Sequence, residues 1–194
     1  MSTAWRLLIQ RALVPRLVRF GQLRAVADAL ETGAGGGFAA ENLLDRFPGW
    51  RLTVTDYDED MVELARARLG RFSHRARVER ADAVSLRYVD RSFDLVISIL
   101  VWHHVEGWQK ALAEAARVLR PRGWLLTVDL LHPFPSGPLR RLRLHGTYEF
   151  DQFRAALAVG GFTRWRVDPG PAWFLALAET APGDERATAS SRRL

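Results

Sequence analysis

The chain has 194 residues, of which 48% are hydrophobic and 26% are charged, close to the average for soluble globular proteins. This length fits one domain with its own core, and the composition excludes disordered, collagen-like and disulfide-scaffold classes. No cysteine is present, which excludes disulfides, thiolate metal ligands and a cysteine nucleophile. The net charge of +6 is carried by arginines, Lys110 being the single lysine, and it permits an anionic partner without requiring one.

The N-terminal segment Trp5–Val18 has apolar residues at helical spacing, with arginines between them. We expect an amphipathic helix that Pro15 kinks or interrupts. Residues 1–24 would then cover a pocket as a lid, or alternatively lie on a membrane as a basic surface helix. No small-residue cleavage site follows, so we expect a cytoplasmic protein, with peripheral membrane contact as the alternative.

Apolar or β-branched runs alternate with helical patterns in the next part of the chain. The predicted strands are Ala25–Glu31, Arg51–Asp56, Ala76–Ala81, Phe93–Ile99 and Trp124–Leu130. The predicted helices are Phe38–Phe47, Glu59–Leu69 and Gly107–Leu119, the last one ended by Pro121-Arg122-Gly123. This alternation indicates an α/β fold with a doubly wound, mostly parallel sheet and helices on both faces.

The C-terminal part contains a loop-like stretch, a helix and two further strands. Residues 132–146 are rich in proline, glycine and arginine, and Phe150–Val159 has a helical pattern. The strands Phe162–Val167 and Trp173–Ala178 are joined by a tight turn, so one of them runs antiparallel to the rest of the seven-stranded sheet. Residues 25–178 are therefore expected to form one domain, followed by a disordered tail over residues 179–194.

A glycine cluster follows the first predicted strand, in the segment Glu31-Thr32-Gly33-Ala34-Gly35-Gly36-Gly37. Glycines there allow a sharp turn close to a ligand, and the next helix offers free N–H groups to an anion. Asp56 ends the second strand, where a carboxylate can accept hydrogen bonds from a ribose diol. The alternatives are a turn that only reverses the chain and a helix N-cap at Asp56.

The glycine spacing distinguishes two classes of nucleotide-binding fold. Dinucleotide-binding folds use G-x-G-x-x-G, but Phe38 stands where the third glycine would be. The acidic residue followed by x-G-x-G-x-G instead resembles the first motif of the class I S-adenosylmethionine-dependent methyltransferases. Other segments are similar to that family in the same order: Asp56-Tyr57-Asp58 with Met61, Ala81-Asp82-Ala83, Ser92–Val96, Val101–Val105, Ala115–Pro121 and Gly161-Phe162. The small-molecule branch, which includes quinone-biosynthesis methyltransferases, is the nearest.

This resemblance implies a Rossmann-like fold with S-adenosyl-L-methionine as cofactor and S-adenosyl-L-homocysteine as product. Glu31 would hold the methionine ammonium, Asp56 the ribose and Asp82 the adenine amino group, with no metal. The cofactor-binding residues that it implies are Glu31, Gly33, Ala34, Gly35, Gly37, Asp56, Tyr57, Asp82, Ala83, Ser98 and Ile99.

Methyl transfer is an in-line displacement for which the cofactor carries the reactivity, so a base is needed only if the acceptor must lose a proton. His103 is the first candidate base and His104 the weaker one, because both follow the fourth strand. For each, the alternative is a packed, hydrogen-bonded histidine, which we favour for His104.

We expect the acceptor to be a small apolar or aromatic molecule, methylated on O, C or N. The motif of enzymes that methylate nucleobase amino groups is missing after the fourth strand, so nucleic acid is not expected. Trp102, Tyr148, Phe150 and Trp173 form either a substrate wall or part of the core. A non-catalytic cofactor-binding module and an NAD-dependent oxidoreductase are the alternative functions, and the sequence does not decide the oligomeric state.

Overall fold

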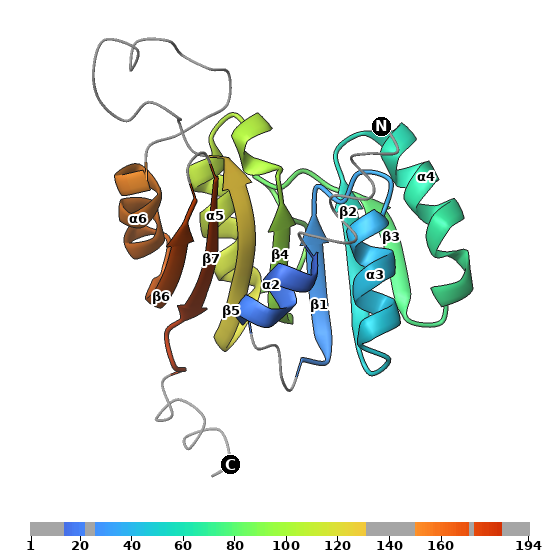
Figure 1. Cartoon of the computed structure of the whole chain (residues 1–194), viewed down its shortest axis with the longest axis horizontal. Coiled ribbons are helices and arrows are strands. Elements are labelled where there is room, and N and C mark those ends of the chain that lie inside the picture. Colours follow the sequence, from blue (N-terminus) through green and yellow to red (C-terminus); the bar gives the residue numbers. More distant parts are fainter. Residues whose placement is uncertain (1–13, 22–25, 131–149, 171–172, 184–194) are drawn as a thin grey trace, which may run out of the picture.

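The computed structural model describes residues 14–21, 26–130, 150–170 and 173–183. Seven strands form one sheet in the order β3-β2-β1-β4-β5-β7-β6 (Figure 1). Neighbouring strands are parallel except that β7 runs antiparallel to both β5 and β6. The predicted doubly wound sheet with an antiparallel closing hairpin is confirmed. Its strand order reverses between β1 and β4, which is where open α/β sheets bind ligands.

The elements have the following bounds. The strands are β1 Asp28–Thr32, β2 Arg51–Asp56, β3 Ala76–Arg80, β4 Phe93–Ile99, β5 Leu119–Leu130, β6 Phe162–Pro169 and β7 Trp173–Thr180. The helices are α2 Val14–Gly21, α3 Phe38–Arg46, α4 Glu59–Leu69, α5 Trp108–Val118 and α6 Phe150–Val159, with short 3-10 turns η2 Gly70–Phe72 and η3 Trp102–His104.

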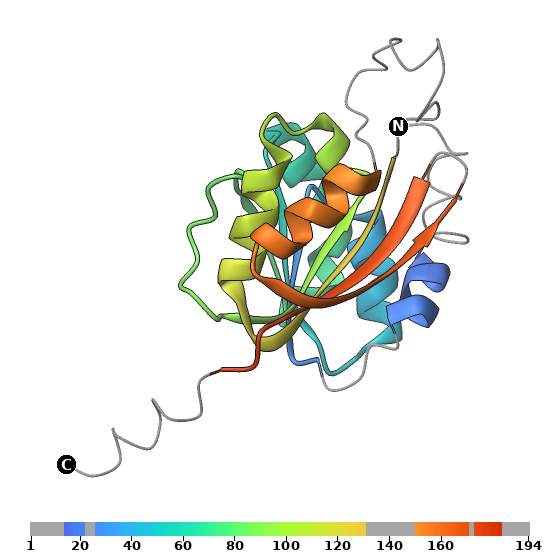
Figure 2. The ribbon, with the colours of Figure 1, turned by 90° about the vertical axis from the view of Figure 1, so that its left-hand side faces the viewer.

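Helices cover both faces of the sheet and create two cores (Figure 2). Leu17 of α2 and Leu43 of α3 belong to the core on one face. Leu112 of α5 and Phe153 of α6 belong to the core on the other. Because both faces are covered, β4 is apolar at almost every position, as a strand buried on both faces requires.

The helix α2 is part of this packing. Its side chain Arg16 pairs with Asp168 of β6 at 3.2 Å and lies 4.5 Å from the ring centroid of Trp173. Pro15 is the second residue of the described helix, and the residues before Val14 lie outside the described part of the chain, so the kink or interruption expected at Pro15 stays a prediction. Because α2 packs on the sheet, residues 14–21 belong to the domain, whereas residues 5–13 of the predicted Trp5–Val18 helix lie outside the described residues.

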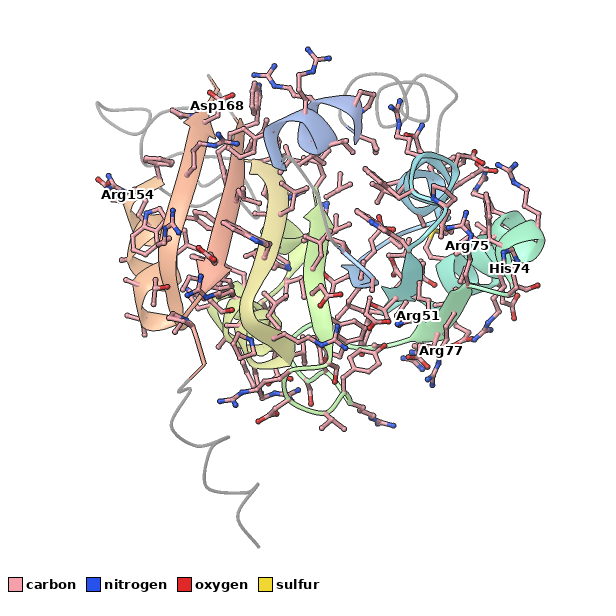
Figure 3. The ribbon with its side chains drawn as sticks, turned by 90° about the horizontal axis from the view of Figure 1, so that it is seen from below. Arg51, His74, Arg75, Arg77, Arg154 and Asp168 are labelled. Atoms are coloured by element: carbon pink, nitrogen blue, oxygen red, sulfur yellow. The ribbon has the colours of Figure 1, made fainter. Side chains whose placement is uncertain are left out.

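The first strand starts at Asp28, three residues later than predicted, within a cluster of charges. Asp28 pairs with Arg51 at 2.7 Å and with Arg120 at 3.0 Å. The Asp94 carboxylate accepts the N–H of Asp28 at 2.9 Å and pairs with Arg120 at 2.6 Å. The cluster ties the amino ends of β1, β2, β4 and β5 together, at the end of the sheet that Figure 3 views, where Arg51 is labelled.

The strand β5 is longer than predicted, because Pro121-Arg122-Gly123 continues it instead of breaking the chain. Arg122 adopts a left-handed φ of 60°, and a Cβ at Gly123 would lie 2.7 Å from the Arg120 carbonyl oxygen. The Thr180 hydroxyl donates to that carbonyl at 2.8 Å, which carries β7 two residues past the predicted domain end at 178. Residues 131–149 and 184–194 lie outside the described residues. Within the described part, no helix is long and apolar enough to cross a membrane.

Candidate functional site

A cavity of about 880 Å³ opens at the carboxyl ends of β1, β2 and β4, where the strand order reverses. It brings together residues from the loops that follow β1, β2, β3 and β4. Among the predicted cofactor residues, all but Gly37 and Ser98 line it. Ser98 is fully buried in β4, and no residue of α2 lines the cavity, so the described part of the N-terminal segment is not a lid over it.

The glycine loop needs its glycines for two different reasons. Gly33, Gly35 and Gly37 have φ values of 67°, 52° and 76°, in the left-handed region that favours glycine. A Cβ on Gly33 would overlap the side chain of Val101, which packs directly on this loop. A Cβ on Gly37 would lie 3.2 Å from Ala65 Cβ, so Gly37 starts α3 and allows α4 to pack closely against it.

Asp56 fixes the shape of the loop from the end of β2. Its Oδ2 accepts the N–H of Gly35 at 2.7 Å, and its Oδ1 accepts the N–H of Asp58 at 3.0 Å. The N-cap of α4 is Asp58, whose side chain accepts the N–H of Asp60, so the capping alternative for Asp56 is wrong. Asp56 therefore presents its carboxylate to the cavity while it holds the glycine loop.

Glu31 is an acid buried in the cavity wall. Its side chain is 1% exposed, and its Oε2 has no hydrogen-bond partner among the described residues. Burial raises the pKa of Glu31 to about 8, and the negative charge of Asp56 adds to this effect. An unpaired buried carboxyl oxygen is costly, and a cationic group in the cavity would satisfy it.

The far end of the cavity suits a flat base. The side chain of Tyr57 is 65% exposed at its mouth, and Arg80 donates from Nε to the Tyr57 carbonyl at 2.9 Å. The Asp82 carboxylate accepts the N–H of Val84 at 3.0 Å, which orders the loop after β3. Tyr57, Asp82 and Ala83 together provide an aromatic face and a polar edge.

The two histidines after β4 have the opposite roles to those expected, which were His103 as the first candidate base and His104 as the packed histidine. His103 is the packed one, with Nδ1 2.5 Å from Oδ1 of the fully buried Asp129. The other Asp129 oxygen accepts the N–H of Trp102 at 2.8 Å. His104 lines the cavity, and its ring centroid lies 3.8 Å from that of His103. Sequence reasoning missed Asp129, for which the available signal was an acid at the carboxyl end of an apolar strand.

The remaining wall is apolar. Leu100, Val101 and Val105 line the cavity, and Leu100 holds a left-handed φ of 56° just after β4. Phe38, which stands where the dinucleotide-binding motif has its third glycine, also lines the cavity. Of the aromatic residues proposed as a substrate wall, Trp102, Phe150 and Trp173 pack with the cores, and Tyr148 lies outside the described residues.

Comparisons with known proteins agree with this geometry. A family model described as a methyltransferase domain matches residues 30–127. The malonyl-(acyl-carrier protein) O-methyltransferase of Geobacter sulfurreducens is 34% identical over 171 residues, 79% of this chain and 63% of that protein. The demethylmenaquinone methyltransferase of Thermus thermophilus is 30% identical over 173 residues, 81% of this chain and 77% of that protein.

The same fold is found among solved structures. A SAM-dependent methyltransferase from Aquifex aeolicus superimposes with a TM-score of 0.73 at 21% identity, over 90% of this chain and 93% of that one. The cavity at the reversal of strand order and the glycine loop define a nucleotide-binding α/β protein. The chain belongs to the class I methyltransferase-domain family, whose cofactor is S-adenosylmethionine. It spans less than half the length of several curated relatives, 48% and 43% in two cases.

Proposed function

We propose that this chain transfers a methyl group from S-adenosylmethionine to a small-molecule acceptor. The observation that carries the proposal is one cavity walled by Glu31, Gly33, Gly35, Asp56 and Asp82 at the reversal of strand order. Bound there, the cofactor would supply an activated methyl group: the acceptor's lone pair would bond to the methyl carbon in line with the breaking carbon–sulfur bond, and the thioether S-adenosylhomocysteine would leave.

We assign the cofactor contacts according to the chemistry of each side chain. The buried Glu31 carboxylate binds the methionine ammonium, because its Oε2 has no partner among the described residues. Asp56 accepts from the ribose hydroxyls, and Asp82 accepts from the adenine amino group. Tyr57 covers the adenine face.

The acceptor end of the cavity favours an apolar or aromatic molecule. Leu100, Val101 and Val105 give it an apolar wall, while His104 and Glu106 add polar groups. The Thermus relative is named for demethylmenaquinone and the Geobacter relative for a malonyl group on a carrier protein. These two names differ in the kind of acceptor, and the apolar wall here favours an apolar or aromatic one.

The histidine pair is our candidate for removing a proton from the acceptor. His104 lies in the cavity wall, with the ring of His103 behind it. Asp129 bonds Nδ1 of His103, which fixes that ring and makes Nε2 its proton-accepting nitrogen. We propose His104 as the group that contacts the acceptor and His103 with Asp129 as positioning residues. His104→Ala should then abolish the rise of the rate with pH on the acidic side of the pH-rate profile. Asp129→Asn should lower the rate, because it loosens the His103 ring behind His104.

The test is calorimetric titration with S-adenosylhomocysteine. Wild type should bind in the micromolar range and Asp56→Ala about tenfold or more weakly, a loss of about 1.4 kcal/mol. Asp58→Ala is the matched control, because this neighbouring carboxylate caps α4 and does not line the cavity. Absence of wild-type binding overturns the proposal. Binding without methyl transfer to any of a broad acceptor panel favours the non-catalytic module.

A further inference from the structure

We infer that Arg68 of α4 is a positioning residue for the carboxylate of the cofactor's methionine end; this inference rests on the proposed function. Arg68 does not line the cavity. Its Nε donates to the Gly36 carbonyl at 2.6 Å, and its guanidinium carbon lies 3.4 Å from the ring centroid of Phe38. Phe38 is itself a wall residue, so the guanidinium is stacked against a residue of the cavity wall.

The glycine loop is enclosed between α4 and the cavity. Leu64, Ala65 and Arg68 lie on one face of α4, because they are three and four residues apart. A Cβ on Gly36 would lie 3.8 Å from Leu64 Cβ, and one on Gly37 would contact Ala65. The backbone of the loop therefore rests on this face of α4, and Arg68 supplies the polar contact to it.

The N-terminal end of α3, which follows the glycine loop, carries the partial positive charge of the helix dipole, and its N-cap residue contributes no capping side chain. Hydrogen bonds within the site use the N–H groups of Ala34, Gly35 and Gly37. The N-cap residue Gly37 has no side-chain hydrogen bond to the first turn of α3. The first-turn N–H groups of Ala39 and Ala40 are not among those used in these bonds, and together with the helix dipole they favour an anion.

A second observation in the same cavity points to the ligand. The buried Oε2 of Glu31 lacks a partner among the described residues and suits an ammonium group. An ammonium at Glu31 and a carboxylate at the start of α3 are the two ends of an amino acid. Arg68 shares its charge with Glu41 at 3.5 Å, and it acts on the carboxylate half of this arrangement through the Gly36 carbonyl, which its Nε holds beside the start of α3.

Two ligands separate this role from a purely structural one. S-adenosylhomocysteine carries the amino-acid end, whereas 5′-methylthioadenosine has the same nucleoside and thioether without it. Arg68→Met keeps the apolar stem but removes the charge and the Nε donor. It should weaken S-adenosylhomocysteine about tenfold or more and leave 5′-methylthioadenosine within about twofold. Arg68→Lys, which keeps the charge without the planar donor, should fall between wild type and Arg68→Met.

The control is Arg66→Met on the same helix. Arg66 is exposed and pairs with Glu59 at 3.3 Å, so both ligands should bind this variant as they bind wild type. Equal losses for the two ligands in Arg68→Met and Arg68→Lys would mean that the loop has simply lost its shape, and would overturn the inference. So would unchanged S-adenosylhomocysteine affinity in both. A wild type that binds neither ligand overturns the proposed function itself.

Discussion

Glu31 combines burial with an unsatisfied oxygen, and this makes cofactor binding sensitive to protons. With a pKa of about 8 the side chain is mostly protonated at pH 7. An ammonium group beside it favours the carboxylate, so binding should expel close to one proton per ligand. Calorimetry of S-adenosylhomocysteine at pH 7 in buffers of different ionisation enthalpy measures this number. Glu31→Gln should abolish the release, and a wild-type binding enthalpy that is independent of the buffer would refute the assignment.

Gly33 and Gly35 should respond differently to the same substitution. Both have left-handed φ values, but a Cβ on Gly33 meets Val101 while one on Gly35 has no atom within 4 Å. Gly35→Ala should cost about 1 kcal/mol of backbone strain, and Gly33→Ala clearly more, with loss of cofactor affinity. Urea denaturation and ligand titration of the two variants provide the comparison. Equal effects would show that the contact with Val101 is not restrictive.

The sequence predicted which acidic residues near the glycine loop line the cavity. It did not predict which of two adjacent histidine side chains points toward the cavity. Glu31 and Asp56 flank the loop at fixed spacings, and both line the cavity. His103 and His104 are neighbours in a 3-10 turn, so the sequence does not show which ring faces the cavity. Asp129, which decides the matter by binding His103, comes from a different strand.

At the scale of elements, the backbone of β5 is strained at Arg122. Its φ of 60° is unfavourable for a residue with a Cβ and is adopted easily by glycine. Arg122→Gly should therefore stabilise the protein by about 1 kcal/mol, because the relieved strain exceeds the added entropy of the unfolded chain. Thermal unfolding checks this, with Arg91→Gly, also left-handed at φ 60° but outside the strands, for comparison. A lower melting temperature for Arg122→Gly would contradict it.

The sequence misplaced those elements whose limits depend on tertiary contacts. Pro121-Arg122-Gly123 has the composition of a break, and the pairing of β5 with β4 is irregular there, yet the segment stays within β5. Thr180 of β7 accepts the N–H of Gly123 and donates to the Arg120 carbonyl. The mostly parallel sheet and its antiparallel closing hairpin, in contrast, followed from the alternation of elements and the tight final turn.

For the whole molecule, the free energy of unfolding should fall both as the pH rises above about 5 and as it falls below about 4. Folding raises the pKa of Glu31 from 4.5 to about 8, so the folded state binds more protons between these values. The free energy of unfolding should therefore fall as pH rises from about 5 to 8. Hydrogen bonds from Arg51 and Arg117 hold the pKa values of Asp28 and Glu114 below their usual range. Their smaller, solvent-screened contribution is present above about pH 4 and is lost on further acidification.

Urea denaturation from pH 3 to 9, without ligand, measures both limbs. Glu31→Gln should remove the decline between pH 5 and 8, while Glu59→Gln, an exposed residue of α4, should leave it in place. A wild-type profile that is flat over this range would contradict the assignment to Glu31.

The contact between Val101 and Gly33 joins the two halves of the cavity. Gly33 belongs to the loop that would cradle the cofactor, and Val101 begins the segment that would meet the acceptor. Because the two residues are in direct contact, a displacement of one also displaces the other. The two small molecules should accordingly show heterotropic cooperativity: each should alter the affinity of the other, and by the same factor in both directions.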